Sequence, residues 1–361
     1  GCVGFLACFG CDQGTPELQS SVGPPLRVLA TYPSAEEGVQ CVSSTDPACG
    51  VPFDAPIELR FDRHLAHATA VRQSLLVYPG DPQIPVFLLP EYDVVERVLR
   101  YFPSEPLQPN TLYTVELTQP SSSSPFGFRA FDSAPLGEGP VPLRFSFFTS
   151  AQSAALQPAC EPTCEDVVRR LQVSGCARFG CHNAEPDPSA CATGKALDNN
   201  QECVGVPRMG LNLASIPALR ETAIGRVAHQ AEIGPSGGVP LVNPARMGVQ
   251  MPLIDAGRPG NSYLLYKLLL RSANFESPPD EQLTPDERVR RAACTPIYRS
   301  RLPEGETRVA SEEERIRLRD WFVRGEGMPL LARAADPNRS ALTLDALHEI
   351  QTWIARGAVC P

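Results

Sequence analysis

The chain has 361 residues, a net charge of −9 at pH 7 and 42% hydrophobic residues. This length exceeds what one ordinary domain needs, so two domains are expected. No run rich in Lys and Arg occurs, which argues against nucleic acid as a partner. The 38 prolines and 27 glycines indicate many turns and long connections, and the hydrophobic content still suffices for real cores.

The first residues, GCVGFLACFGC, are apolar and rich in small residues, and polar DQGTPELQSS follows them abruptly. This pattern is typical of the end of a secretory signal. A cysteine at such a switch resembles a bacterial lipoprotein cleavage site, and Cys11 fits best because Gly10 precedes it. Cys8 is the second choice, and an ordinary cleaved signal is the alternative. We therefore expect residues 1–24 to be a signal remnant and lipoprotein linker of an exported protein, periplasmic or at the outer membrane or cell surface.

Four runs in residues 25–150 alternate with period two and are separated by Pro, Gly, Asn and Ser. The apolar members of these runs are Leu26, Val28, Ala30 and Tyr32; Ile57, Leu59 and Phe61; Tyr113, Val115 and Leu117; and Val141, Leu143, Phe145 and Phe147. Such runs predict antiparallel strands that each bury one face, and together they predict a β-sandwich. We interpret His64 and His67 as solvated polar residues near a strand end, since two histidines without further ligands make a poor metal site.

The phrases TYPSAEEGV, VPFDAPIELRFDRHL, LQPNTLYTVELT and RFSFFTS occur in this order along the chain. Together they resemble the bacterial Ig-like domains of surface proteins, over residues 25–150. The resemblance implies an Ig-like sandwich that serves as a spacer or a stalk.

Residues 151–162 are interpreted as a linker, and the hydrophobic period after them is that of helices. The apolar stripes that mark the expected helices contain Val167, Val168 and Leu171; Leu318, Trp321 and Phe322; and Leu344, Leu347, Ile350 and Ile354. A further apolar helix is expected from about Asn261. Ser311 and Glu314 predict a capping box at the start of the second stripe. Residues 163–361 are therefore expected to be mostly helical, with long irregular connections.

Cys176 and Cys181 are separated by four residues, and His182 follows the second cysteine directly. A c-type haem is held by two cysteine thioethers, with the next histidine beneath the iron, at a usual spacing of C-x-x-C-H. The wider loop can still span the two vinyl groups if its extra residues bulge. On spacing alone, haem attachment, a Cys176–Cys181 disulfide and a zinc site are all open.

Thirteen cysteines are many for a protein of a reducing compartment, which supports export. Without the three N-terminal cysteines and the pair before His182, eight remain, an even number that allows up to four disulfides. These disulfide candidates are Cys41, Cys49, Cys160, Cys164, Cys191, Cys203, Cys294 and Cys360.

The phrases CARFGCHN, MGLNLAS, GRPGNSYLLYKLL, GMPL and LTLDALHEIQTWIARGA also occur in order. They resemble the planctomycete-type cytochrome c domain at the end of many exported bacterial lipoproteins, over about residues 160–361. The chain departs from that pattern in its four-residue spacer and in its long cysteine-bearing inserts. The resemblance implies one covalent haem c on Cys176 and Cys181, with His182 as an axial ligand of the iron.

The sixth iron ligand is expected to be a methionine, because a thioether opposite histidine favours ferrous iron and a high potential. The resemblance points to Met328, which with Pro329 occupies the Met-Pro position before the terminal helix. Met251 and His229 are the alternatives, and any single methionine can instead be core filler. Five apolar residues are expected in the core, where they would also wall a haem: Trp321, Phe322, Trp353, Leu264 and Leu268.

The fold class that follows is a multidomain chain, with an N-terminal all-β Ig-like sandwich at 25–150 and a mostly α cytochrome c-like domain at 163–361. The expected function is exported electron transfer by a single haem, without enzyme activity; an accessory subunit of a redox enzyme is one alternative. The other is a haem-free structural or adhesive surface protein with a Cys176–Cys181 disulfide. Expected partners are a redox protein, a membrane reached through the lipid anchor, and an assembly with itself or other chains.

Overall fold

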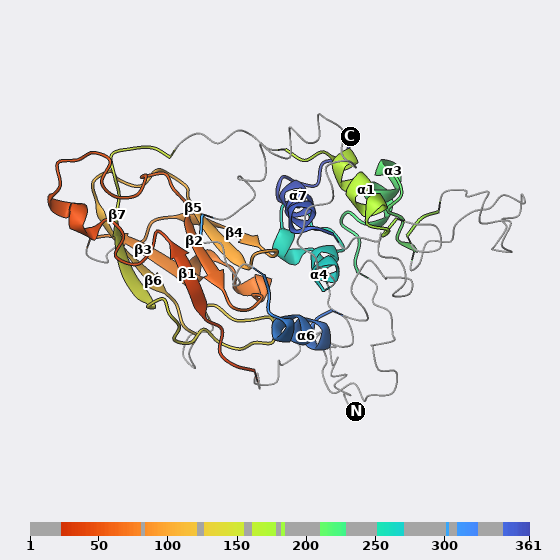
Figure 1. The fold of residues 1–361 in the computed structure, drawn as a ribbon, viewed down its shortest axis with the longest axis horizontal. Helices are drawn as coiled ribbons and strands as arrows, with labels where there is room; N and C mark the ends of the chain where they lie inside the picture. Colours follow the sequence, from red (N-terminus) through yellow and green to blue (C-terminus); the bar gives the residue numbers. More distant parts are fainter. Residues whose placement is uncertain are drawn as a thin grey trace, which may run out of the picture.

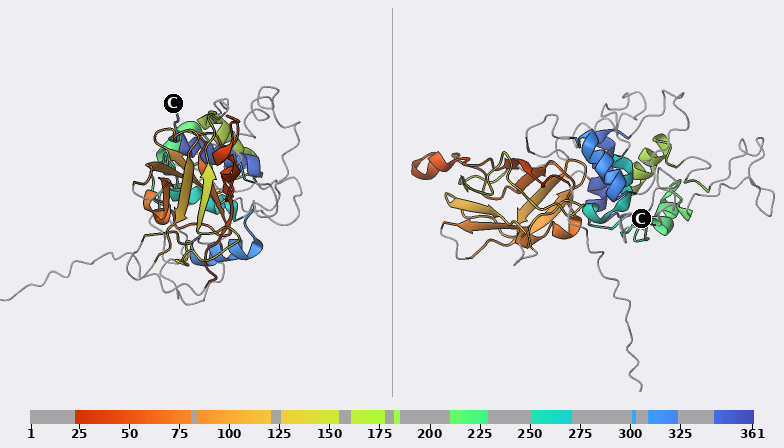
Figure 2. Two further views of the ribbon diagram at one scale, coloured as in Figure 1. Left: turned by 90° about the vertical axis from the view of Figure 1, so that its left-hand side faces the viewer. Right: turned by 90° about the horizontal axis from the view of Figure 1, so that it is seen from below.

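The computed structural model describes ten segments of the chain, which are residues 23–80, 84–120, 126–154, 161–177, 182–184, 210–228, 251–270, 301–302, 309–323 and 342–361. We call the described residues up to 154 the β half and those from 161 onward the helical half. Across these segments, seven strands lie in the β half and five α-helices in the helical half. The helices gather at one end of the sheets (Figures 1 and 2).

Two antiparallel sheets make up the β half, with strand orders β1-β2-β5-β4 and β3-β6-β7. The strands are β1 (Val28–Tyr32), β2 (Ile57–Phe61), β3 (Leu75–Pro79), β4 (Leu88–Asp93), β5 (Val98–Pro103), β6 (Leu112–Leu117) and β7 (Arg144–Phe148). Alternating apolar residues turn inward, as Tyr113 and Val115 do in β6. Aromatic pairs fill the core, and the Tyr113 and Phe147 rings stack with centroids 5.7 Å apart.

Strand β2 is buried on both faces, which an antiparallel strand at the surface of a sandwich would not be. Ile57, Leu59 and Phe61 belong to the hydrophobic core of the β half. Glu58 and Arg60 point to the opposite face, because side chains alternate along a strand, and they are buried as well. The helical half therefore covers the second face of this sheet.

The helices are α1 (Cys164–Val173), α3 (Ile216–Thr222), α4 (Tyr263–Leu269), α6 (Glu312–Trp321) and α7 (Leu344–Ala355). The predicted apolar stripes of α1 and α7 are buried, as Leu171 and Ile350 illustrate. Side-chain caps begin three of the helices, because Thr163, Ser311 and Thr343 each accept a backbone N–H of the first turn. None of the described helices is both long and apolar enough to span a bilayer.

The predicted fold class, an all-β Ig-like sandwich followed by a mostly α cytochrome c-like domain, is wrong. The described residues form seven strands in two antiparallel sheets with five short helices, and the C-terminal part is not clearly a helical cytochrome domain. Buried residues of both halves join in one hydrophobic cluster, so the helices pack against a sheet as well as against each other. The domain boundaries at 24/25, 150/151 and 162/163 stay predictions.

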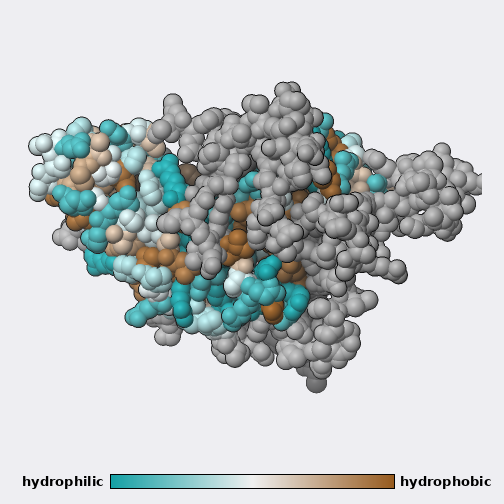
Figure 3. Space-filling view, viewed as in Figure 1, coloured by the Kyte–Doolittle hydropathy of each residue, from teal (hydrophilic) through white to brown (hydrophobic). Residues whose placement is uncertain are grey.

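The visible surface mixes hydrophilic residues with smaller hydrophobic groups (Figure 3). Among the exposed hydrophobic residues, Leu89 and Phe102 are cross-strand neighbours on β4 and β5. Phe87 comes just before β4, close in sequence to Leu89, and the guanidinium of Arg72 sits 4.4 Å from the centre of the Phe87 ring. These residues lie at the far end of the hairpin from its turn.

Candidate functional site: a buried charged interface

The turn between β4 and β5 is buried, although turns normally lie on the surface. Its residues Val94, Val95, Glu96 and Arg97 are at most 3% exposed. The Val95 N–H donates to Oε1 of Gln351 in α7 at 3.2 Å. The Arg97 guanidinium donates to the Phe61 carbonyl at 3.1 Å and to the Val309 carbonyl at 3.2 Å. The hairpin tip is therefore inserted into the helical half and bonded on two sides.

A chain of five polar side chains connects this turn with α7 and the sheet. His348 of α7 lies between two carboxylates, with Nε2 at 3.1 Å from Glu96 Oε1 and Nδ1 at 3.9 Å from Asp93 Oδ2. Glu96 Oε2 accepts a hydrogen bond from Arg60 at 2.8 Å, and Asp93 Oδ2 accepts one from Arg100 at 3.0 Å. Each of the two carboxylates beside His348 thus accepts a hydrogen bond from an arginine, in a place from which water is excluded.

The strand register places further charges beside this chain. Glu58, Arg100 and Glu91 lie side by side on β2, β5 and β4, so each carboxylate faces the same guanidinium. Glu58 Oε2 also accepts the backbone N–H of Arg301 at 2.9 Å, which is a contact from the helical half. Burial raises the pKa of Glu58 and of Glu91, although Arg100 opposes this shift in both.

A second buried cluster joins α6 to the β half. Glu314 Oε2 accepts from Arg63 Nε at 3.2 Å, and Glu314 Oε1 accepts the backbone N–H of His64 at 2.8 Å. Arg63 also donates to Asp132. Ser311 Oγ accepts the Glu314 N–H at 3.2 Å, so half of the predicted capping box forms. The Glu314 carboxylate bonds to the β half, and burial raises its pKa to about 7.

The interpretation of His64 as a solvated residue is wrong. Its side chain is 1% exposed, and neither ring nitrogen has a hydrogen-bond partner among the described residues. Burial, followed by the charges of Arg97 and Arg63, holds the pKa of His64 well below its usual value. The ring lies edge-on to that of Tyr266 in α4, with centroids 6.0 Å apart, because the helical half covers this strand end. His67 is exposed.

Two of the three residues proposed to hold haem are described. Cys176 is buried, and its Sγ accepts a hydrogen bond from Ser174 Oγ at 3.3 Å. His182 is buried too, and its Nδ1 lies 3.1 Å from the Leu211 carbonyl oxygen. In the tautomer with a proton on Nδ1, this nitrogen donates to that carbonyl. Cys181 lies outside the described residues.

Of the other residues predicted to bind the iron or a lipid, only Met251 lies among the described residues. Met328, His229 and Cys11 lie outside the described residues and stay predictions. Met251 is buried in the hydrophobic core. Three of the expected wall residues, Leu264, Leu268 and Trp353, are core residues, Phe322 packs against the core, and the side chain of Trp321 is not described. Within the described segments, no group of three or more His, Cys, Asp or Glu residues could hold a metal ion.

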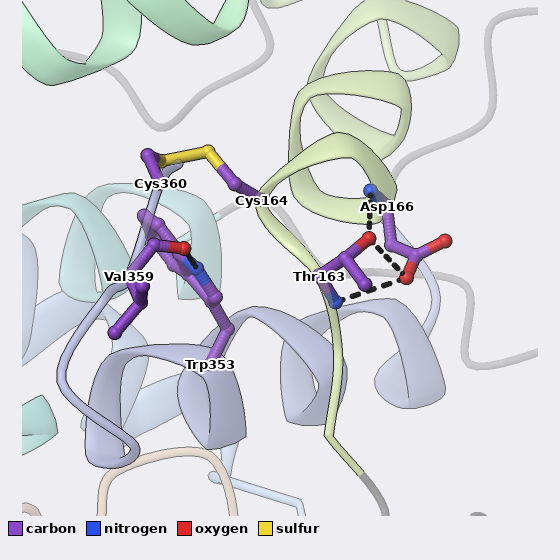
Figure 4. Close-up of a disulfide and its surroundings, with 6 residues drawn as sticks. All are labelled: Thr163, Cys164, Asp166, Trp353, Val359 and Cys360. Atoms are coloured by element: carbon purple, nitrogen blue, oxygen red, sulfur yellow. Dashed lines mark hydrogen bonds between the residues drawn. A yellow bond between two sulfur atoms is a disulfide. The ribbon is translucent and has the colours of Figure 1, made fainter.

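Two disulfides pair four of the eight candidate cysteines, namely Cys41 with Cys49 and Cys164 with Cys360. The second joins the first residue of α1 to the end of the chain, across 196 positions (Figure 4). Trp353 lies beside it, and its Nε1 donates to the Val359 carbonyl at 3.1 Å. Cys160, Cys191, Cys203 and Cys294 lie outside the described residues.

No protein-family model matches the chain, and no curated protein matches it significantly. Solved structures with a partial likeness include the N-terminal part of the bacterial S-layer protein SbsC, at 11% identity and a TM-score of 0.24 over 35% of this chain and 24% of that one. A longer SbsC chain, residues 31–844, aligns at 10% identity and a TM-score of 0.25, over 39% and 16%. PcoC, a methionine-rich copper resistance protein from Escherichia coli, aligns at 15% and 0.24, over 35% and 100%. The chain thus spans a quarter or less of these S-layer chains, and likenesses this weak assign neither a fold nor a function.

Proposed function

We propose that the protein is an exported, haem-free structural protein of the cell surface, in which Cys176 and Cys181 form a disulfide. This proposal rests on one observation: buried charged side chains hold the β half and the helical half together as one body. A rigid body keeps its two ends at a fixed separation, which is what a structural or adhesive role requires. The Cys164–Cys360 disulfide reinforces that body, and disulfides persist in oxidising compartments outside the cytosol.

The packing of two residues that were expected to wall a haem supports the proposal that the protein is haem-free. The Phe322 ring meets the Tyr266 ring edge-on, with centroids 4.8 Å apart, and lies 6.1 Å from the ring of Phe131 in the β half. Trp353 is held by its hydrogen bond beside the disulfide. Phe322 thus packs on aromatic rings of both halves, as core residues do, and needs no cofactor beside it to fill its surroundings.

A second candidate is an electron carrier with one haem c on Cys176 and Cys181. The orientation of His182 favours it, because a histidine that donates through Nδ1 carries its lone pair on Nε2, the nitrogen that binds iron. The haem would supply one-electron transfer. Met328 would be the sixth ligand, with Met251 or His229 as the alternatives.

A pyridine haemochrome spectrum of the full chain, made in a host with the c-type maturation machinery, tests the first candidate against the second. We expect no haemochrome band, because the two cysteines are engaged with each other. The matched control is Cys181→Ser, which should give the same featureless spectrum. A band that is present in the wild type and lost in Cys181→Ser would establish the second candidate instead. Digestion of intact cells by an added protease should remove the protein if it lies at the surface.

A further inference from the structure

The imidazole ring of His64 lies in the contact between the two halves without a hydrogen bond. The residue follows β2 and is 1% exposed, and neither ring nitrogen has a hydrogen-bond partner among the described residues. The ring of Tyr266 in α4 covers it edge-on, with the centroids 6.0 Å apart. Buried polar atoms are normally paired, and leaving them unpaired costs least when the ring carries no charge.

The backbone of His64 is fixed from both halves. Its N–H donates to Glu314 Oε1 of α6 at 2.8 Å, and its carbonyl oxygen accepts the N–H of Phe131 at 3.1 Å. The N–H of the next residue, Leu65, donates to the Tyr92 hydroxyl at 2.9 Å. These bonds hold the side chain beneath the helices, so its ring reaches water only when the helical half moves away.

The groups around the ring offer a protonated imidazole no partner. The charged and titratable residues on the elements packed around it are Asp62, Arg63, Tyr92, Arg97, Asp132, Tyr266 and Glu314. The guanidiniums of Arg63 and Arg97 repel a positive ring. The Glu314 carboxylate accepts from Arg63 and from the His64 backbone, and Asp132 accepts from Arg63. A proton on the ring would therefore place an unpaired charge where water is excluded.

We propose that His64 is an acid-sensitive joint between the halves: its neutral ring lets α4 close over this strand end, and a protonated ring drives α4 away. The open form takes up the proton, because water solvates the imidazolium there, and the docked form does not. Acid therefore favours the open form through this one residue.

The direction of the pH dependence follows from linkage. Burial, and then the charges of Arg97 and Arg63, lower the pKa of docked His64 well below 6.5, whereas the open form titrates near 6.5. The contribution of His64 to docking is thus fully present above pH 6.5, and it is lost as the pH falls below that value. Burial raises the pKa of Glu314 and of Asp62, and both acids act in the opposite direction, so His64 is measured against a variant that keeps them.

Hydrogen–deuterium exchange of the full chain, corrected for intrinsic exchange rates, gives the opening constant of α4 in the wild type and in His64→Phe. Phenylalanine fills a similar volume and takes up no proton. Glu314 and Asp62 are present in both proteins, so their contributions cancel in the ratio of the two constants. We expect the ratio of wild type to His64→Phe to rise about 25-fold from pH 7 to pH 5, from the value of 6.5 for the open form. The matched control is the exposed His67, since His67→Phe should keep the wild-type profile.

A ratio that stays level between pH 7 and pH 5, or the same change of profile in His67→Phe, would overturn the proposal. If His64→Phe does not fold, a nitrogen-15 NMR titration of the wild-type imidazole rings decides instead. We expect the His64 nitrogens to keep the shifts of a neutral ring down to pH 5, and a midpoint near 6.5 in the folded chain would contradict the joint.

Discussion

Replacing Glu96 by alanine is expected to lower the free energy of unfolding by about 3–5 kcal/mol. The substitution removes the carboxylate that lies between Arg60 and His348, and both of these partners are almost fully buried. Arg60 would lose the carboxylate that accepts its hydrogen bond at 2.8 Å, in a place where water cannot replace it. Urea denaturation followed by circular dichroism measures the loss.

Glu116→Ala is the matched control for Glu96→Ala. Glu116 is an exposed residue of β6, so its removal should change the free energy of unfolding by no more than about 0.5 kcal/mol. Equal losses in the two variants would mean that the buried chain of charges does not hold the helical half to the sheet.

Removing the long-range disulfide with the double variant Cys164→Ala/Cys360→Ala is expected to lower the free energy of unfolding by about 5 kcal/mol. The bond closes a loop of 196 positions, so its loss releases much chain entropy in the unfolded state. Cys41→Ala/Cys49→Ala opens a loop of only 8 positions and should lose less, about 2.5 kcal/mol. The midpoints of urea unfolding give both values, and a larger loss in the short-loop variant would contradict the entropic account.

Period-two alternation placed the inward residues correctly where a strand is regular, as in β2 and β6. It failed in β1, where the register shifts between Val28 and Ala30. After this bulge Thr31, and not Ala30 or Tyr32, is paired with core residue Leu59 and buried. One extra residue in a strand leaves the list of apolar positions unchanged, so hydrophobic periodicity alone does not reveal it.

The charged interface was missed because alternating charges normally mark the solvent face of a strand. Glu58 and Arg60 fit that pattern, yet the helical half covers them. The partners come from far along the chain, and Arg63 and Glu314 are 251 positions apart. The run YDVVERVLRYF did carry a usable signal, since its charged residues are set among apolar residues that a surface turn would not need.

Short-range sequence patterns indicated where a candidate residue lies better than they indicated what its side chain binds. Ser311 and Glu314 begin a helix as predicted, but the Glu314 side chain bonds across the interface instead of to its own helix end. The spacing of Cys176 and Cys181 likewise predicts a linked pair, and it does not distinguish a thioether from a disulfide. In both cases the partner is chosen by tertiary packing, which a local pattern does not contain.

A tryptic map of the exported full chain under non-reducing conditions tests the proposed haem-free function most directly. Trypsin cleaves after Arg178, between the two cysteines, so any link between them joins the peptides Leu171–Arg178 and Phe179–Lys195. We expect these two peptides to be joined by a disulfide that reduction separates and that is lost in Cys181→Ser, since the second peptide also contains Cys191. A pair that carries the added mass of one haem and survives reduction would contradict the proposal.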